Sequence, residues 1–382
     1  MIRQAVRPPR PAAPADPGRG RRYLPVLGWF LGIRLLGVAA LAVWSWIDGT
    51  SARVLLSERW DSLWYVRVAE QGYGFTLTAK DGRVLSDMAF FPLFPMLEKF
   101  LSWVLPVTPA NAGLLVSLIA SLFAAAGIFA VVEGFLGERA GFFTVLLWGL
   151  LPVGIVESMA YTESLFTALA AWSLYCLQRE RWVAGGLLAL AAGLTGPPGA
   201  ALVVAVWGAV GLGIRRDGWS VRAAAGALLA PAGLVGYVLW VGGRTGGLFG
   251  YLGVQKAWGN RFDGGYTFAR FILGRIAGPA FPAGIALCAG VWLLLWCQVL
   301  AFRRRYPAAL QIYSAALLVI VLGASAYIGS KPRLLIPAFV LLIPAATRLA
   351  ASRKRTAWTV VALLCVISAG YGAFWLNGSG PP

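Results

Sequence analysis

Long apolar runs recur along most of this sequence, separated by short charged or Pro/Gly-containing breaks. Of its 382 residues, 59% are hydrophobic and only 13% are charged. A soluble core cannot bury that much apolar surface, whereas a lipid bilayer accommodates it. The 47 glycines suit helices that pack closely in lipid, where small residues let backbones approach. The sequence therefore predicts an all-α polytopic membrane protein.

The net charge of +18 comes mostly from short basic clusters between the apolar runs. In a soluble protein such a charge indicates nucleic acid, but no soluble domain here is large enough to bind one. The clusters instead follow the pattern of cytoplasmic loops, so we expect membrane lipids and no nucleic acid as partners. These clusters are Arg19/Arg21/Arg22, Arg179/Arg181, Arg215/Arg216/Arg222, Arg303–Arg305 and Arg348/Arg353–Arg355.

Eleven spans with a cytoplasmic N-terminus put every one of these clusters on the cytoplasmic side of the cell membrane. Residues 1–22 are expected to be a disordered basic segment, and residues 23–382 a single transmembrane domain. The run after residue 22 is too long for a signal peptide, so we interpret it as an uncleaved first span. The predicted spans are Leu24–Ile47, Asn111–Val132, Gly141–Val156, Glu163–Gln178, Trp182–Leu194, Gly199–Ile214, Val221–Val241, Pro279–Ala301, Pro307–Ile328, Leu334–Thr347 and Ala357–Leu376.

Two segments need special treatment in this topology. Met88–Pro106 contains internal prolines and the Glu98/Lys99 pair, so it is predicted to be an amphipathic interfacial segment and not a span. Trp182–Ile214 must be two half-spans that meet at the GPPG sequence of residues 196–199, and broken helices at membrane depth usually line a cavity. Asp48–Ala110 then becomes one large external loop.

Most carboxylates fall on the external side of this topology, where the loops 48–110 and 242–278 are predicted to form the active-site face. Ten of the 15 are placed there: Asp48, Glu58, Asp61, Glu70, Asp81, Asp87, Glu98, Glu157, Glu163 and Asp263. The sequence contains no histidine, which excludes Ser-His-Asp and Cys-His catalysis. Its four cysteines lie inside apolar runs without metal-ligand spacing. Carboxylates, tyrosines and basic residues must therefore carry the chemistry.

The stretch RWDSLWYVRVAEQGYG, Arg59–Gly74, follows closely on the first apolar run. A helix that begins at Glu58 with Ser57 as its N-cap would place Asp61 on one face with aromatic side chains. An acid favoured by the helix dipole and an interfacial aromatic belt would explain these residues without a function. A carboxylate among aromatic rings is equally suited to act as a general base toward a sugar hydroxyl.

The sequence RWDSLWY…AEQGY followed by AFFPLFPML resembles the signature of the GPI mannosyltransferase II (PIG-V) family, within the GT-C superfamily of integral-membrane glycosyltransferases. Further matching motifs follow in the same order: ESMAYTESLF, QKAW and KPRLLIPAF. Arg34 fits the family's habit of an arginine in the first span. The resemblance extends over most of the chain from Arg34 to Phe339.

This resemblance implies a GT-C-type bundle and an inverting glycosyltransferase that takes mannose from a polyprenyl-phosphate-linked donor. It implies a cell-envelope acceptor on the external side of the membrane and an essential acid at Asp61. Asp61 is also a candidate ligand for a divalent metal at the donor phosphate. The sequence has no D-x-D motif and no Gly-rich nucleotide loop, which agrees with a lipid donor and not a nucleotide sugar.

The remaining candidate residues come from the matching motifs. Lys331 and Arg333 would offset the charge of the leaving phosphate, although ordinary loop charges at an interface explain them as well. Arg34, in mid-span, needs a cavity or a partner unless it snorkels toward the cytoplasm. The residues expected to bind substrate are Arg34, Trp60, Trp64, Tyr65, Glu157, Tyr161, Glu163, Gln255, Trp258, Lys331 and Arg333.

One position departs from the family pattern. Many members carry an arginine after the threonine between the half-spans, whereas this chain reads LTGPPG over residues 194–199. If that arginine contacts phosphate in the family, its role here has moved or been lost. Two other functions therefore stay open: a transporter or flippase for a lipid-linked saccharide, and an inactive scaffold that binds one. Inverted repeats would support a transporter, and none stands out.

The charge distribution predicts which side of the membrane each loop faces. A single cysteine introduced at Thr78 should react with a membrane-impermeant maleimide in intact cells. A single cysteine at Arg304 should react only after the cells are permeabilised. Labelling of both positions from one side would contradict the topology, and with it the grouping of the external loops.

Overall fold

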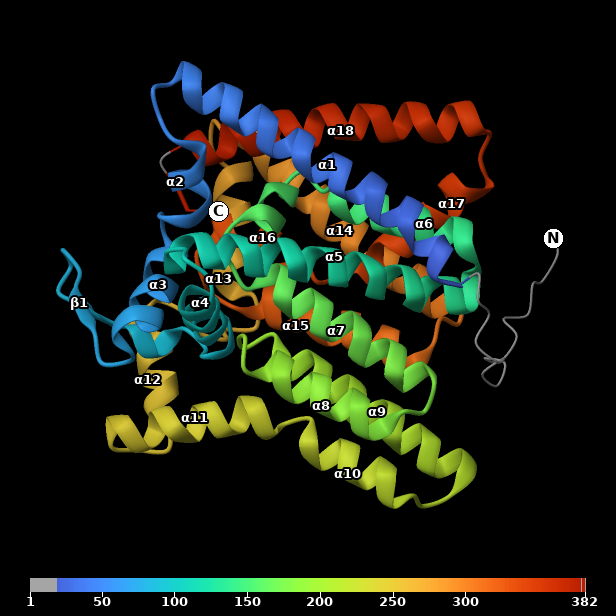
Figure 1. Ribbon diagram of the computed structural model, residues 1–382, viewed down its shortest axis with the longest axis horizontal. Coiled ribbons are helices and arrows are strands. Elements are labelled where there is room, and N and C mark those ends of the chain that lie inside the picture. Colours follow the sequence, from blue (N-terminus) through green and yellow to red (C-terminus); the bar gives the residue numbers. More distant parts are fainter. Residues whose placement is uncertain (1–18, 379, 382) are drawn as a thin grey trace.

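The computed structural model describes residues 19–378 and 380–381, and it is a helical bundle (Figure 1). Its α-helices are α1 (Arg19–Ile47), α2 (Ala52–Ser57), α3 (Asp61–Gln71), α4 (Leu93–Val104), α5 (Pro109–Leu136), α6 (Glu138–Gly149), α7 (Glu163–Gln178), α8 (Trp182–Gly193), α9 (Gly199–Asp217), α10 (Val221–Leu229), α11 (Ala232–Thr245), α12 (Gly250–Ala257), α13 (Tyr266–Ile276), α14 (Phe281–Arg303), α15 (Ala308–Gly323), α16 (Lys331–Leu334), α17 (Ile343–Ala351) and α18 (Lys354–Asn377).

Short 3₁₀ turns and one small hairpin complete the fold. The turns are η1 (Asp87–Ala89), η2 (Gly154–Ser158), η3 (Ile328–Ser330) and η4 (Phe339–Leu342). Strands β1 (Thr76–Thr78) and β2 (Val84–Ser86) pair antiparallel, with Leu77 opposite Leu85. The hairpin, α2, α3, α4 and α12 gather at one end of the bundle, at the left of Figure 1.

The chain is a multi-pass membrane protein, as the sequence predicted. Each of the eleven predicted spans coincides with a helix or with a broken helix. Among the described residues, six helical segments are long and apolar enough to cross a membrane unaided: Arg22–Ile47, Pro109–Leu136, Gly199–Asp217, Val221–Thr245, Phe281–Arg303 and Lys354–Asn377.

Helix α1 extends beyond the N-terminal end of the predicted first span. The first 18 residues of the segment predicted to be disordered lie outside the described residues. From Arg19 onward the backbone is already helical, four residues before the predicted start of the domain at residue 23. Arginine is a good helix former, so the helix of the first span continues through the basic cluster that precedes it.

Two breaks divide the bundle where the sequence carries proline and glycine. The predicted break is confirmed, because α8 ends at Gly193 and α9 begins at Gly199. Only α8 is shorter than a full span, since α9 is long enough to cross a membrane by itself. A side chain at Gly199 would start 2.7 Å from the Cα of Gly193, so the sharp turn requires glycine there. The span predicted at Leu334–Thr347 is not continuous, because the helical segments before and after residues 335–338 meet at 75°.

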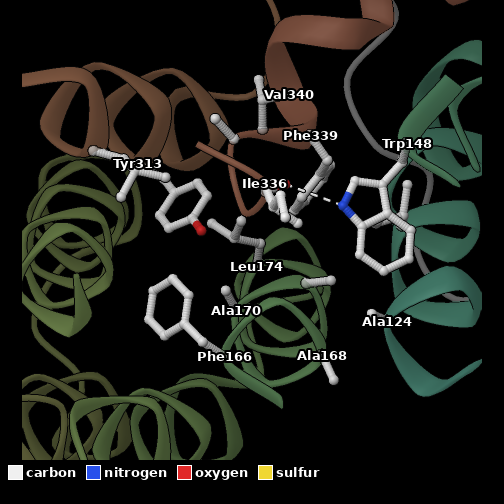
Figure 2. Close-up of a cluster of buried hydrophobic side chains, with 14 of the residues drawn as sticks. Ala124, Trp148, Phe166, Ala168, Ala170, Leu174, Tyr313, Ile336, Phe339 and Val340 are labelled. Carbon is white, nitrogen blue, oxygen red and sulfur yellow. Dashed lines mark hydrogen bonds between the residues drawn. The ribbon is translucent and has the colours of Figure 1, made fainter. Parts of the chain in front are cut away.

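The apolar core supports the second of these breaks (Figure 2). Trp148 of α6 donates from its indole Nε1 to the carbonyl of Ile336 at 3.0 Å. The hydroxyl of Tyr313, from α15, donates to the carbonyl of Pro337 at 3.2 Å. Both aromatic side chains are fully buried. The core thereby satisfies backbone carbonyls that an interrupted helix leaves without partners and that lipid cannot satisfy.

The segment 48–108 forms a compact cap and not an open loop. The predicted amphipathic segment Met88–Pro106 contains α4, which packs against α3 and α5. The helix expected to begin at Glu58 begins instead at Asp61. Trp60 adopts a φ of 55°, which ends the preceding turn, and the Ser57 hydroxyl donates to the Arg53 carbonyl at 2.9 Å without capping the new helix.

Glu98 of α4 is a buried carboxyl inside this cap. It is fully buried, and neither of its oxygens has a hydrogen-bond partner among the described residues. Its carboxyl lies where a side chain of Gly113 would be, 2.3 Å from an ideal Cβ there. Burial raises the pKa of Glu98 to about 9, and the negative charge of Glu70 adds to the shift.

Glu98→Gln should remove a pH dependence of stability. The folded state holds the Glu98 proton up to about pH 9, whereas the unfolded chain releases it near 4.5. Stability is therefore full below the lower value and falls as the pH rises toward the upper one. Between about pH 5 and about pH 8.5, the apparent Tm of wild type in detergent should fall relative to that of the variant.

Glu138→Gln, at an exposed position of α6, is the control and should follow wild type at each pH. Parallel curves for wild type and Glu98→Gln would show that the carboxyl is hydrated or paired.

Candidate functional site

Four side chains from distant parts of the chain meet in one cluster, called here the acid–arginine cluster: Asp61, Tyr161, Glu163 and Arg333. Arg333 Nη2 lies 2.5 Å from Asp61 Oδ2, and its Nε lies 3.2 Å from Glu163 Oε1. The guanidinium carbon is 4.7 Å from the centre of the Tyr161 ring. All four residues belong to the sites predicted from the sequence, and the fold brings them together.

Helix starts position both carboxylates of the cluster. Asp61 is the first residue of α3, and Glu163 is the first residue of α7. The backbone N–H of Asp61 donates to the Tyr161 hydroxyl at 3.3 Å, which ties the start of α3 to the chain just before α7. Partial positive charges at helix N-termini stabilise carboxylates. The arginine and the two helix ends thus place positive charge beside both acids.

Asp61 is the member of the cluster most open to a ligand. Its side chain is 27% exposed, compared with 11% for Arg333 and 8% for Glu163. The nearby Tyr65 is buried, and burial raises the pKa of its hydroxyl well above the ordinary value, with further raising by the charges of Asp61 and Glu163. Tyr65 therefore stays neutral at physiological pH and offers a hydroxyl proton beside two acids.

Two donor nitrogens of Arg333, Nε and Nη1, make no hydrogen bond to the described residues, and of these only Nε has a carboxylate close by, that of Glu163. Arg333 Nη1 is buried. An unpaired buried donor is costly, so this nitrogen is a candidate contact for a bound anion. A divalent ion at Asp61 would instead have to displace the guanidinium. Among the described residues no group of three or more His, Cys, Asp and Glu side chains is placed to hold a metal.

Lys331 does not join the cluster, although it is only two residues from Arg333. Its ammonium donates to the carbonyls of Val321 and Ala324 at 2.7 and 2.6 Å, and it lies 4.9 Å from the centre of the Phe268 ring. The side chain is buried and satisfies carbonyls at the end of α15. In this structure Lys331 holds the fold together.

Arg34 and Glu157 lie inside the bundle and form a buried pair with 3.5 Å between Nη1 and Oε2. Arg34 also donates to the carbonyls of Gly149 and Gly154. Its charge thus finds partners within the protein, and the alternative that it snorkels toward the cytoplasm is wrong. Neither residue belongs to the acid–arginine cluster.

Three side chains that were predicted to bind substrate instead join the two external loops to each other. Trp64 stacks on Phe90 at 5.5 Å and meets the edge of Trp258 at 4.9 Å. Trp258 donates to the carbonyl of Ser86 at 2.9 Å, and Gln255 donates to that of Ala89 at 3.3 Å. These side chains join segment 48–110 to segment 242–278.

Trp60 differs from these aromatic residues. It precedes Asp61, is partly exposed, and has the guanidinium carbon of Arg59 4.2 Å from its ring centre. Trp60 therefore adjoins the acid in sequence, with Arg59 packed against its ring.

A cavity that the sequence reading missed lies between α13 and the start of α14. Its volume is about 500 Å³, and Ile328 of η3, just before α16, lines one side. Arg270 and Arg275 contribute positive charge to an otherwise mainly apolar surface. The only sign of it in the sequence is the amphipathic pattern YTFARFILGRI, which is equally compatible with the external loop predicted for residues 242–278. The lining residues are Thr267, Arg270, Phe271, Gly274, Arg275, Gly278, Pro279, Ala280 and Ile328.

No protein-family model and no curated protein sequence matches the chain. Among solved structures it is similar to ArnT from Cupriavidus metallidurans bound to undecaprenyl phosphate, with 19% identity, a TM-score of 0.54, and coverage of 88% of this chain and 62% of that chain. It is also similar to archaeal oligosaccharyltransferase AglB from Archaeoglobus fulgidus, in complex with an inhibitory peptide and a dolichol-phosphate. That match has 12% identity, a TM-score of 0.57, and coverage of 96% and 57%.

The chain thus spans less than two thirds of the length of either neighbour. At these identities the similarity shows the fold, which is the GT-C membrane fold expected from the sequence.

Lys331→Met should destabilise the protein. It leaves two carbonyls near the end of α15 without a donor, and each lost hydrogen bond to a charged group costs about 1.5–3 kcal/mol. The apparent Tm in detergent should drop, whereas Lys256→Met, at an exposed position of α12, should leave it unchanged. An unchanged Tm with weaker binding of a lipid phosphate would support the phosphate contact predicted from the sequence instead.

Proposed function

We propose that this protein is an inverting glycosyltransferase that moves mannose from a polyprenyl-phosphate-linked donor to a cell-envelope acceptor on the external side of the membrane. The observation that carries the proposal is the acid–arginine cluster, in which the most exposed acid, Asp61, is held at a helix start by a buried arginine. The lipid phosphates in the structures of ArnT and AglB support a lipid-phosphate donor. The choice of mannose rests on the PIG-V-like motifs.

In the proposed reaction, Asp61 accepts the proton of the acceptor hydroxyl. The oxygen of that hydroxyl attacks the anomeric carbon of the donor sugar. The new C–O bond forms on the face opposite the leaving group, and the bond from the anomeric carbon to the phosphate oxygen breaks. The polyprenyl phosphate departs with the electron pair of that bond. A single displacement of this kind inverts the configuration at the anomeric carbon.

Arg333 is the proposed contact for the departing phosphate. Its Nη1 is a buried donor with no hydrogen-bond partner among the described residues, and a charge-assisted hydrogen bond to phosphate is among the stronger ones that a protein can make. Glu163 holds the guanidinium through Nε at 3.2 Å, so the arginine keeps its place when Asp61 takes up a proton. A positive group fixed where charge develops lowers the barrier without reorganisation.

The cavity beside α13 is the proposed binding site for the donor lipid. It is mainly apolar and it carries Arg270 and Arg275. One lining residue, Ile328, precedes Arg333 by five positions in the sequence. An isoprenoid chain with a phosphate head requires an apolar surface next to positive charge. We therefore assign this cavity to the polyprenyl chain of the donor within the proposal.

Asp61→Asn should lose at least about 100-fold in transfer rate, because general acid–base catalysis contributes about 10²–10⁴-fold. Asparagine keeps the shape of the side chain and removes its basicity, so insertion, folding and donor binding should change little. The measurement is transfer of radiolabelled mannose from purified polyprenyl-phosphate-mannose by the protein in detergent or nanodiscs.

Glu58→Gln is the matched control, since Glu58 lies three residues away and forms an exposed pair with Arg53. It should keep wild-type turnover. Wild-type turnover of Asp61→Asn would overturn the assignment of the base, and full activity with a soluble nucleotide-mannose would overturn the lipid donor. Donor binding by wild type without any turnover would favour the scaffold or transporter alternative. Chelation that abolishes turnover would assign a metal to Asp61.

A further inference from the structure

We infer that the buried Arg34–Glu157 pair is a positioning device that sets the geometry of the acid–arginine cluster and does not contact substrate. The inference rests on the proposed function, because it concerns how the reacting groups are held. The sequence predicted both residues to bind substrate. In the structure Arg34 is 4% exposed and Glu157 is fully buried, so neither offers a surface to a sugar.

Arg34 closes the gap between α6 and η2. Its guanidinium donates to the carbonyl of Gly149, the last residue of α6, and to that of Gly154, the first residue of η2. The last carbonyls of a helix have no partner within it, and an apolar bundle offers few alternatives. One side chain from α1 thus fixes both ends of the four-residue break.

Gly154 is shaped for this contact. A side chain at this position would start 3.1 Å from Arg34 Nη2 and 3.0 Å from the Gly149 carbonyl oxygen. A larger residue would crowd both the guanidinium and the carbonyl that it reaches. The break is therefore built around Arg34.

Glu157 links Arg34 to the segment that positions the acid–arginine cluster. Its side chain lies 3.5 Å from Arg34, and its carbonyl accepts a hydrogen bond of 3.0 Å from the hydroxyl of Ser164. Ser164 directly follows Glu163, whose carboxylate holds Arg333. The path from α1 to the guanidinium thus runs through one ion pair and one hydrogen bond.

A second connection reaches Asp61 from the other side. The N–H of Ala160 donates to the carbonyl of Leu56 at 2.9 Å, in the helix just before Asp61. The next residue is Tyr161, whose hydroxyl receives the N–H of Asp61. The segment from η2 to α7 therefore bears on both acids. A misplacement of about 1 Å in a reacting group can cost about 100-fold in rate.

The energetics favour a positioning role over a stabilising one. Neither oxygen of Glu157 has a hydrogen-bond donor among the described residues, so the carboxylate is under-satisfied. Buried ion pairs often contribute little net stability, because desolvation offsets their attraction. A buried pair that adds little net stability is explained if it fixes the position of η2.

The experiment is a double-mutant cycle on transfer kinetics with the full-length protein and polyprenyl-phosphate-mannose. Glu157→Gln should lower kcat by about 10–100-fold with KM for the donor nearly unchanged, because it disturbs geometry and not binding. Combined with Glu163→Gln, it should cause no more loss than the larger single effect, since both act through the same guanidinium. Ser164→Ala should lower kcat in the same direction and leaves the charge pair intact.

Glu133→Gln is the matched control. Glu133, in α5, pairs with Arg22 at 3.2 Å, and Arg22 belongs to α1 as Arg34 does. It should leave kcat unchanged and add nothing to Glu163→Gln.

Three results would overturn the inference: a raised KM with unchanged kcat in Glu157→Gln, losses that multiply in the double variant, or a wild-type kcat in Ser164→Ala. Ser164→Ala alone decides the matter if Glu157→Gln does not fold. Asp61→Asn distinguishes a failure of the positioning role from a failure of the proposed function. If it is inactive while Ser164→Ala and Glu157→Gln behave as wild type, only the positioning role fails. If it retains wild-type turnover, the proposed function itself fails.

Discussion

The guanidinium of Arg333 joins three segments of the chain that are far apart in sequence. An arginine side chain does not lose its charge in a protein, so a buried one must find matching groups where it lies. Asp61 and Glu163 supply them from the first residues of two helices, and the ring of Tyr161 covers the group. The stretch that follows Arg333 is held by Trp148 and Tyr313, so the deep core sets where the cluster lies.

The polar side chains of the bundle concentrate where its helices are interrupted. Arg34 satisfies carbonyls at the break between α6 and η2, and Lys331 satisfies carbonyls at the end of α15. Each interruption leaves backbone groups that hydrocarbon cannot satisfy, and charged side chains with several donors are efficient partners for them. Asp61 and Glu163 likewise lie at helix starts, those of α3 and α7. The structural need for polar groups and the candidate site thus occur in the same region of the fold.

Sequence motifs named the members of the site but not their relationships. Asp61 and Arg333 are separated by 272 positions, and nothing local to either residue indicates that they touch. Lys331 and Arg333 share one motif and one charge, yet one ties down α15 while the other faces the acids. Trp64 and Trp258 were predicted to bind substrate, and they pack against each other between two loops.

The sequence by itself determined the helical membrane class, the positions of the apolar segments and the break at residues 194–198, because hydropathy and the backbone limits of proline and glycine are local properties. It also singled out Asp61 through a motif. The tertiary structure alone decided that α3 begins at Asp61, that the span near Pro337 is bent, and that Arg34 pairs with Glu157. Those outcomes depend on which distant side chains are available to satisfy a buried charge or carbonyl, and that depends on how the whole chain packs.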